Sequence, residues 1–377
     1  MDGPSRGRKR ALPLLGLVAL GGLISACGAQ PAASKTSFSK YSIAYANSSS
    51  AGPIEDAIAG SFLSAGHKLG IKLFTYNNED SGSTALTNAS VMISDHPSAI
   101  IDYNLVSGVG TVLGTKFTAS HIPCVSINVP IPGCPFANLS NRISGIQAGT
   151  IIGAAAKAKG WTAANTTVVA VSCTTCGPNI EHSSSYFYTT VAPYLNMPRV
   201  AASSITVDTT HIGSYYVQVA DPALTIDQAY TNTLTALQTL PAHQHLAVFA
   251  VNDDASIGAW RAIVASGRSN YTLIGGLSGL PEGLAQLRTN PHWIAEGSLF
   301  LQAWGEYAIA EAVSILKGAK PPALTPLPQI TMTKQTVNTY YPNGSNTPKE
   351  LPPLVAGNRY LLRGGVLQAI GNVQGVK

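Results

Sequence analysis

Two cysteines separated by two residues, Cys173 and Cys176, form the motif in this sequence most suggestive of chemistry. Such a pair can act as a redox centre, supply half of a metal site or close a structural disulfide. A redox role favours a first thiol at a helix N-terminus, where its pKa falls. Here the pair follows the apolar run 168–171 and precedes Gly177 and Pro178, which indicates a loop. A structural disulfide is therefore favoured, and redox, metal and free-thiol roles remain as alternatives.

A third cysteine, Cys27, ends a segment typical of exported proteins. Four basic residues precede the apolar stretch 11–23, which is shorter than the roughly 20 residues that span a bilayer. Ser25 and Ala26 then lead into Cys27, an order that resembles the bacterial lipobox, in which the cysteine is acylated and becomes the N-terminus. We expect residues 1–26 to be a signal peptide, Cys27 to anchor the chain to the bacterial cell membrane from outside the cytoplasm, and residues 27–40 to form a flexible tether. An ordinary signal peptide with a chance cysteine is the alternative.

Four cysteines remain for the body of the protein: Cys124, Cys134, Cys173 and Cys176. An even number outside the cytoplasm suggests disulfides, although four cysteines allow three pairings. Closeness in sequence favours Cys124 with Cys134 and Cys173 with Cys176.

The charge and motif content exclude several functional classes. The net charge of +5 falls to +2 without residues 1–26, which argues against a nucleic-acid partner. The sequence has no P-loop, no GxSxG elbow, no HExxH and no paired-carboxylate motif. His243 and His245 resemble a metal pair, but no carboxylate or cysteine is close in sequence, so we interpret them as two solvated histidines. We expect no catalytic residue, no metal and no cofactor.

Short β-rich runs alternate with amphipathic, helix-length segments from residue 41 onward. In residues 53–69, for example, Ile54, Ile58 and Phe62 share one helical face before Gly70 ends the helix. The predicted strands are 41–46, 71–76, 99–103, 123–128, 167–171, 199–207, 246–251, 271–275, 293–300 and 330–339. The predicted helices are 53–69, 83–93, 106–119, 144–158, 183–195, 225–239, 255–266 and 301–317. This order predicts an α/β fold with two doubly wound parallel-sheet lobes.

Three stretches resemble the ribose-type periplasmic binding proteins, the type I solute-binding components of sugar ABC importers. Residues 248–259 are similar to the family signature in which a strand ends in Asn-Asp and runs into a helix. Residues 274–283 match the next family strand and its downstream helix, and residues 330–342 resemble the closing strand. The resemblance covers about residues 41–342.

The resemblance implies two lobes joined by a three-segment hinge, with ligand bound between them at the carboxyl ends of the strands. The N-terminal lobe would comprise residues 41–143 plus 299–325, and the C-terminal lobe residues 144–298 plus 326–342. Residues 343–377 would be a C-terminal extension whose structure the sequence does not predict. The implied partners are a small-molecule solute and an ABC permease with its cytoplasmic ATPase. The lobes would close around the solute by a hinge motion, and the permease would recognise the closed form.

Several polar residues stand where the family contacts its ligand. Asn252 belongs to the family Asn-Asp pair and could read a hydroxyl as donor or acceptor, or else cap the following helix. Asp253 is as suited to capping or hinge support as to ligand contact. Asn128 ends one predicted strand, and Tyr103 and Asn104 end the preceding one.

Other positions depart from the family pattern. Aromatic residues that would stack on a sugar ring are missing after the first strand, and charges that read hydroxyls are missing near His182 and Ser278. Glu55 and His182 are candidates to replace the lost polarity, and Ser278 occupies the position of a family Asp. A sugar is therefore the default ligand only. A sensory binding protein that serves a receptor kinase or chemoreceptor, and an exported enzyme that uses Cys173 and Cys176, are the alternatives to transport.

Overall fold

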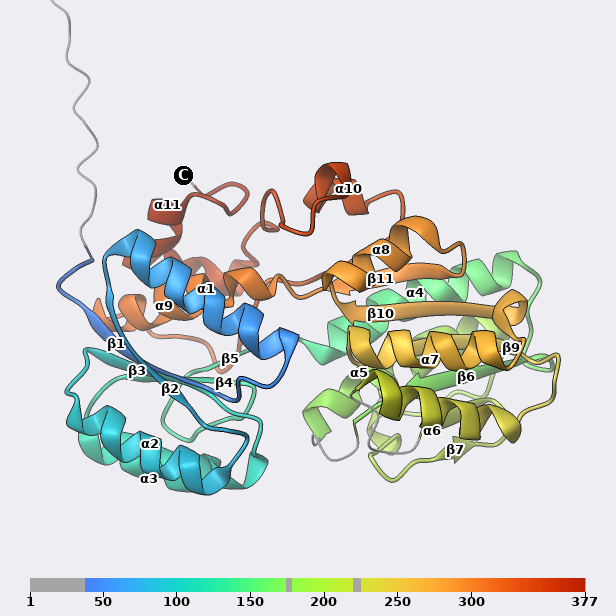
Figure 1. Ribbon diagram of the computed structural model, residues 1–377, viewed down its shortest axis with the longest axis horizontal. Helices are drawn as coiled ribbons and strands as arrows, with labels where there is room; N and C mark the ends of the chain where they lie inside the picture. The colour runs from blue at the N-terminus through green and yellow to red at the C-terminus, as the bar shows by residue number, and fades with distance from the viewer. Residues whose placement is uncertain (1–37, 174–177, 220–224, 377) are drawn as a thin grey trace, which may run out of the picture. The chain divides into compact units, whose positions relative to one another are not determined.

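The computed structural model of the protein describes residues 38–173, 178–219 and 225–376. The described residues form two β-sheets, each flanked by helices (Figure 1). The N-terminal sheet has the strand order β12-β5-β4-β3-β1-β2, and the C-terminal sheet has the order β13-β11-β10-β9-β6-β8-β7. We name the two lobes after these sheets. In both sheets the order runs outward in two directions from the first strand of the lobe, which is the doubly wound arrangement that the alternation predicts.

The N-terminal sheet is entirely parallel. Its strands are β1 (Ser42–Asn47), β2 (Lys72–Asn77), β3 (Ala99–Tyr103), β4 (Cys124–Ile127), β5 (Phe136–Asn138) and β12 (Thr325–Pro326). Its helices are α1 (Pro53–Leu69), α2 (Gly82–Ser94), α3 (Gly110–Ser120) and α9 (Trp304–Leu316). The strands β1, β2 and β3 each lead into a helix, because a parallel neighbour is usually reached by a helical crossover, whereas β4 reaches its parallel neighbour β5 through the loop 128–135.

Alternation along β1 explains how this sheet is covered on both faces. Ile43 and Tyr45 pack in one apolar core with residues of α1 and α9, whereas Ala44 and Ala46 pack in a separate core with residues of α2 and α3. Successive side chains of a strand point to opposite faces, so both sets must be apolar when both faces are buried. Figure 1 shows α2 and α3 side by side on the face opposite α1 and α9.

The C-terminal sheet is parallel except for its two edge strands, β7 and β13, which pair in antiparallel fashion. Its strands are β6 (Thr166–Val171), β7 (His211–Ile212), β8 (Tyr216–Val219), β9 (His245–Ala250), β10 (Thr272–Ser278), β11 (Trp293–Ser298) and β13 (Ile330–Met332). Its helices are α4 (Asn141–Ala158), α5 (Pro178–Leu195), α6 (Ile226–Gln238), α7 (Asp253–Ala265) and α8 (Pro281–Thr289).

Two helix pairs cover the C-terminal sheet, and glycine sets their close approach. A Cβ atom on Gly145 of α4 would overlap the main-chain oxygen of Ser183 in α5. In the same way, a Cβ atom on Gly258 of α7 would overlap the main-chain oxygen of Ile226 in α6. These glycines let the backbones of neighbouring helices touch, so the small-residue composition of residues 144–158 is a packing feature.

The chain passes between the two sheets three times: from β5 to α4, from β11 to α9, and from β12 to β13. Gln329 ties two of these crossings together. Its amide accepts a hydrogen bond from the main-chain N–H of Ser140 and donates to the main-chain oxygen of Ser140 at 3.1 Å and to the hydroxyl of Ser144 at 3.1 Å. The three-segment hinge expected from the sequence is therefore present.

Two predicted strands are wrong. Residues 199–207 contain the short helix η3 (Ala202–Ser204), and the strand that pairs with β6 is β8, further along the chain. The Ser204 hydroxyl donates to the main-chain oxygen of Ala201 at 2.7 Å, the local bonding by which Ser competes with a strand ladder. The predicted strand 330–339 ends at Met332, because a turn at Thr333 leads into the helix α10 (Val337–Tyr340).

The C-terminal segment returns to the N-terminal lobe. The 3-10 helix η7 (Ala356–Gly364) and the helix α11 (Val366–Ile370) pack against α9. The hydroxyl of Ser314 in α9 donates to the main-chain oxygen of Leu361 at 3.0 Å and accepts from the N–H of Gly364 at 3.0 Å. None of the helices in the described ranges is both long and apolar enough to cross a membrane.

Candidate functional site

The residues that directly follow the strands, up to the first turn of the next helix, are here called the carboxyl-end loops. In doubly wound sheets these loops form the ligand-binding edge, because parallel strands bring all their carboxyl ends to one side. Every ligand-contact residue expected from the sequence lies in such a loop, in the first or second turn after it, or at the last position of a strand.

Asn47, the last residue of β1, organises the first carboxyl-end loop. Its side-chain oxygen accepts a hydrogen bond of 2.7 Å from the hydroxyl of Tyr45, and its side-chain nitrogen donates to the main-chain oxygens of Ser49 and Glu55. Tyr45 itself stacks on Phe62 of α1 with ring centroids 3.7 Å apart. The buried aromatic pair therefore fixes Asn47, and Asn47 fixes the loop that positions Glu55.

The ends of β3 and β4 bring three predicted residues together. Tyr103 and Asn104 are buried, and the side-chain oxygen of Asn104 accepts a hydrogen bond of 2.8 Å from the N–H of Val106. The side chain of Asn128 donates to the main-chain oxygen of Asn104 at 3.3 Å. The ring of Tyr103 contacts Trp304 of α9 edge-on, with centroids 6.2 Å apart. Tyr103, Asn104 and Asn128 thus form one cluster at this edge of the sheet.

A disulfide between Cys124 and Cys134 closes the loop that contains Asn128, which confirms the pairing favoured by the short spacing. Cys124 lies in β4 and Cys134 precedes β5, so the bond spans the carboxyl-end loop of β4. The same loop rests on α3, where a Cβ atom on Gly114 would come too close to the backbone of Pro132. The bond and the packing together hold the loop against the lobe.

Two carboxyl groups near the N-terminal cluster, Glu55 and Asp80, have raised pKa values. Burial raises the pKa of Glu55, and the negative charges of Asp80, Asp56 and Asp254 raise it further. Burial also raises the pKa of Asp80, although a hydrogen bond with Ser49 lowers it. Asp254 belongs to the C-terminal lobe, so carboxylates of both lobes contribute to one negative potential.

Asp102 lies directly beneath this cluster, at the penultimate position of β3. It is 1% exposed, and burial raises its pKa to about 7, while the nearby amides of Asn104 and Asn78 act in the opposite direction. Neither carboxylate oxygen of Asp102 nor the side-chain nitrogen of Asn104 has a hydrogen-bond partner among the described residues. Within the described ranges, Asp102 is therefore a buried carboxyl group without a hydrogen-bond partner beneath the cluster.

In the C-terminal lobe, the side chains of Asn252 and Asp253 accept main-chain hydrogen bonds at the start of α7. The side-chain oxygen of Asn252 accepts a hydrogen bond of 2.7 Å from the N–H of Ala255, so Asn252 is the N-cap of α7. Asp253 is fully buried, and its carboxylate accepts from the N–H of Leu280 at 2.7 Å. Asp253 thus supports the loop between β10 and α8.

Glu296 of β11 shares this buried environment with Asp253. Its carboxylate accepts hydrogen bonds from the N–H of Gly279 at 3.2 Å and from the indole of Trp293 at 2.9 Å. The two carboxyl groups are hydrogen-bonded to each other, which requires one of them to be protonated. Burial, followed by the charge of Asp253, holds the pKa of Glu296 well above its usual range. Nothing in the sequence pattern pointed to Glu296.

Ser278 and His182 differ in exposure. Ser278, the last residue of β10, is 2% exposed, and its hydroxyl has no hydrogen-bond partner among the described residues. His182 lies on α5 with its side chain exposed, and its ring meets that of Tyr186 edge-on at 6.2 Å.

Glu181, next to His182, was not among the expected site residues. It lies in the first turn of α5, is 2% exposed, and accepts a hydrogen bond of 2.9 Å from the hydroxyl of Ser172, which directly follows β6. Gln218 of β8 donates to the same oxygen at 3.3 Å, and the hydroxyl of Tyr216 donates to Gln218 at 2.9 Å. Burial raises the pKa of Glu181 to about 7. The sequence held no signal for Glu181, because the predicted helix began at residue 183, whereas α5 begins at Pro178.

Cys173 is disulfide-bonded, which removes a free thiol from the carboxyl end of β6. Cys176 and Cys27 lie outside the described residues. The described residues hold no cluster of three or more His, Cys, Asp or Glu side chains placed to bind a metal ion. The expectation of two solvated histidines needs correction at His245, whose ring stacks on Trp161 with centroids 4.4 Å apart.

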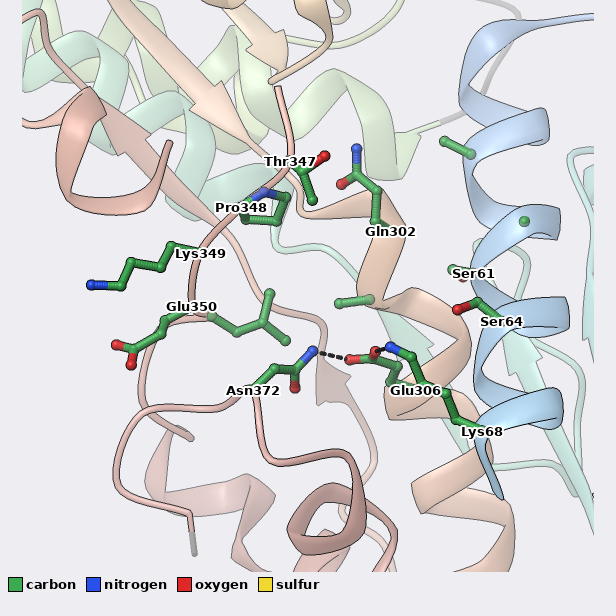
Figure 2. Close-up of a pocket in the computed structure, with 14 residues that line it drawn as sticks. Ser61, Ser64, Lys68, Gln302, Glu306, Thr347, Pro348, Lys349, Glu350 and Asn372 are labelled. Carbon is green, nitrogen blue, oxygen red and sulfur yellow. Dashed lines mark hydrogen bonds and ion pairs between the residues drawn. The ribbon is translucent and has the colours of Figure 1, made fainter. Parts of the chain in front are cut away.

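A cavity of about 490 Å³ lies between α1, the C-terminal segment and the residues that follow β11, among them Gln302, Ala303 and Glu306 (Figure 2). Glu306 at its wall accepts a hydrogen bond of 2.6 Å from Asn372 and forms an ion pair of 3.7 Å with Lys68. Residues 347–351 of the C-terminal segment line the opposite side. None of the expected ligand-contact residues borders this cavity.

Solved structures share the fold. A periplasmic solute-binding protein of an ABC transporter from Actinobacillus succinogenes, with bound D-allose, matches with a TM-score of 0.65 and 15% identity over 80% of this chain and 100% of that chain. An ABC transporter solute-binding protein from Mycobacterium smegmatis, with bound glycerol, gives a TM-score of 0.65 and 15% identity over 80% and 96%. A 5-methylthioribose transporter solute-binding protein from Thermotoga lettingae, in complex with 5-methylthioribose, gives 0.63 and 17% over 89% and 93%. No protein-family model and no curated protein sequence matches the chain.

Proposed function

We propose that this chain, which has the fold of the type I periplasmic solute-binding proteins, captures a small solute outside the cytoplasm and delivers it to an ABC permease. The observation that carries the proposal is the polar cluster of Tyr103, Asn104 and Asn128 at the carboxyl ends of β3 and β4. Asn252 and Ser278 hold the corresponding places after β9 and at the end of β10.

The hinge supports this function. A receptor that closes around a solute needs two bodies that are rigid in themselves and connected by few segments. The three crossings supply such a connection, and Gln329 couples two of them. We propose residues 41–143 plus 299–325 and residues 144–298 plus 326–342 as the two moving lobes, with the packed C-terminal segment as part of the first.

Small hydroxylated molecules are the class of solute that we propose. The solved proteins with this fold include one with bound D-allose, one with bound glycerol and one in complex with 5-methylthioribose. Side-chain amides such as those of Asn104 and Asn128 can read a hydroxyl group as donor or acceptor.

The test is a thermal-shift screen of the full chain, purified in mild detergent, against pentoses, hexoses, polyols and amino sugars. At least one solute should raise Tm in a concentration-dependent way and reduce the radius of gyration measured by X-ray scattering. An Asn128→Ala variant should lose most of the shift, whereas Asn343→Ala, at an exposed turn, should keep it. If no solute raises Tm or compacts the chain, the proposal is wrong.

We also propose that Cys27 carries the lipid anchor. The basic segment, the short apolar run and the small residues before Cys27 support this assignment. Mass spectrometry of the N-terminal peptide from membranes should find an acylated Cys27 as the first residue. A Cys27→Ser variant should retain residues 1–26 or leave the membrane fraction, and an unmodified Cys27 within an intact N-terminus would contradict the anchor.

A further inference from the structure

The carboxyl-end loops carry acidic side chains and few basic ones. In the described part of the chain, the loops after β1, β2, β3, β4, β6, β9 and β10, each taken to the first turn of the next helix, contain no Lys or Arg. The acidic residues in these loops that have raised pKa values are Glu55, Asp80, Glu181, Asp253 and Asp254. The carboxyl-end edge of both sheets therefore offers acidic groups to a ligand and no Lys or Arg in the described parts of these loops.

Two arginines in adjacent segments are engaged with other partners. Arg142, in the loop after β5, places its guanidinium over the ring of Tyr186, 5.0 Å from the centroid. Arg261, a later residue of α7, forms an ion pair of 3.6 Å with Glu282. Neither is paired with Glu181 or Asp254 in the described structure.

Glu181 adds an observation that is independent of the charge count. One oxygen of its carboxylate accepts hydrogen bonds from Ser172 and Gln218, but the other oxygen, Oε1, has no partner among the described residues although the side chain is 2% exposed. A buried carboxylate without a counter-charge is costly, and its remaining oxygen demands a donor. Ser278, at the end of β10, presents a second buried group in the same situation.

We propose that the solute carries a protonated amine as well as hydroxyl groups, and that Glu181, aided by Asp254 and Glu55, binds the ammonium. This inference rests on the proposed solute-binding function and narrows its ligand class. An ammonium supplies both the donor that Oε1 lacks and the positive charge that the loops lack, through a hydrogen bond about twice as strong as a neutral one. A sugar acid would be repelled, and a neutral sugar would supply no positive charge to the buried carboxylate.

The experiment is isothermal titration calorimetry of the full chain with matched ligand sets at pH 7. Each set contains an amine and its neutral counterparts: D-glucosamine with N-acetyl-D-glucosamine and D-glucose, the corresponding galactose set, and glucamine with glucitol. In at least one set the amine should bind about tenfold or more tightly than its neutral counterparts. Glu181→Gln should remove this preference, and Asp254→Asn should reduce it.

Two controls separate binding from folding. Asp208→Asn, an exposed acid of the same lobe away from the carboxyl-end loops, should keep the preference for the amine. Glu181→Asp, which retains the charge on a shorter side chain, should keep part of it, and Tm should identify any variant that fails to fold. If a neutral member binds and its amine binds no better, the amine inference is wrong while the proposed function stands. If no member of any set binds and the broader screen is also empty, the proposed function itself fails.

Discussion

The side-chain amide of Asn128 donates a hydrogen bond of 3.3 Å to the main-chain oxygen of Asn104 and thereby joins the ends of β4 and β3. Asn128 has a φ angle of 66°, in the left-handed region that Asn tolerates better than β-branched residues do. The backbone conformation turns the loop, and the side chain attaches it to the neighbouring strand. Asn128 therefore has a structural role in addition to its proposed contact with ligand.

Replacing Asn128 tests this double role. Asn128→Val should lower the free energy of unfolding by about 2 kcal/mol, because it combines left-handed strain with the loss of a hydrogen bond. Asn128→Gly, which loses the hydrogen bond but tolerates the conformation, should cost about 1 kcal/mol. Urea unfolding measures both values, and equal losses would show that the φ angle does not matter.

The disulfide between Cys124 and Cys134 should contribute measurable stability, since it closes a loop of 10 residues in the unfolded chain. The double variant Cys124→Ala/Cys134→Ala should lower the free energy of unfolding by about 2–3 kcal/mol. Its ligand affinity should also fall, because the bond spans the loop that carries Asn128. Untreated wild-type protein is the reference, and an unchanged midpoint in urea for the double variant would refute the prediction.

The pair formed by Asp253 and Glu296 should make stability depend on pH. Burial raises the pKa of Asp253 to about 6 and holds that of Glu296 well above its usual range. Raised pKa values in the folded state mean that the pair contributes stability at low pH that is lost as pH rises through about 6 and above. The loss can reach about 1.4 kcal/mol per pH unit for one proton.

Asp253→Asn should reduce this loss, because the amide keeps an acceptor for Leu280 and can donate to Glu296. Urea unfolding at pH 5, 7 and 9 measures the slope. The groups that also act on the pair are Asp254, Glu282 and Tyr341, with Arg288 acting on Tyr341. Asp254→Asn therefore serves as the neighbouring control and should keep most of the slope. Identical slopes for wild type and Asp253→Asn would contradict the shared proton.

If an amine binds, its affinity should rise with pH. Burial raises the pKa of Glu181 to about 7, so near pH 6 a proton competes with the ammonium, and near pH 8 it does not. Affinity for glucamine, which stays protonated over this range, should rise by up to about tenfold per pH unit below pH 7 and then level off. The polar groups next to Glu181 are Gln218, Tyr216 and the adjacent residue His182. If Glu181 is the titrating group, Glu181→Gln should flatten the dependence of affinity on pH. A flat profile in the wild type would exclude Glu181 as the anion.

Gly145 should be intolerant of even one added methyl group. A Cβ atom there would overlap the backbone of Ser183, so Gly145→Ala should destabilise the chain by about 1–3 kcal/mol. Gly60, in α1, has open space around its Cα, so Gly60→Ala should stabilise by about 0.5–1 kcal/mol through helix propensity. Thermal unfolding of the two variants makes the comparison, and shifts of the same sign would contradict it.

The sequence alone determined the class of fold, because its periodicity switches repeatedly between strand and helix and the two lobes repeat the same order. It also placed Tyr103, Asn104, Asn128 and Asn252 at strand ends, since these residues directly follow or close apolar runs. It misplaced residues 199–207, where Ser and Thr hydroxyls satisfy the backbone locally and β8 takes the place in the sheet.

Only the tertiary structure decided which polar residues are buried and what surrounds them. Glu181 and Glu296 are unremarkable in sequence, and their chemistry arises because distant segments exclude water from both carboxylates. The pairing of Asp253 with Glu296 joins α7 to β11, and the hydrogen bonds of Glu181 join α5, β6 and β8. Periodicity in a sequence reports which face of an element is apolar, but the pKa and partners of a buried carboxyl group depend on residues that are neighbours only after folding.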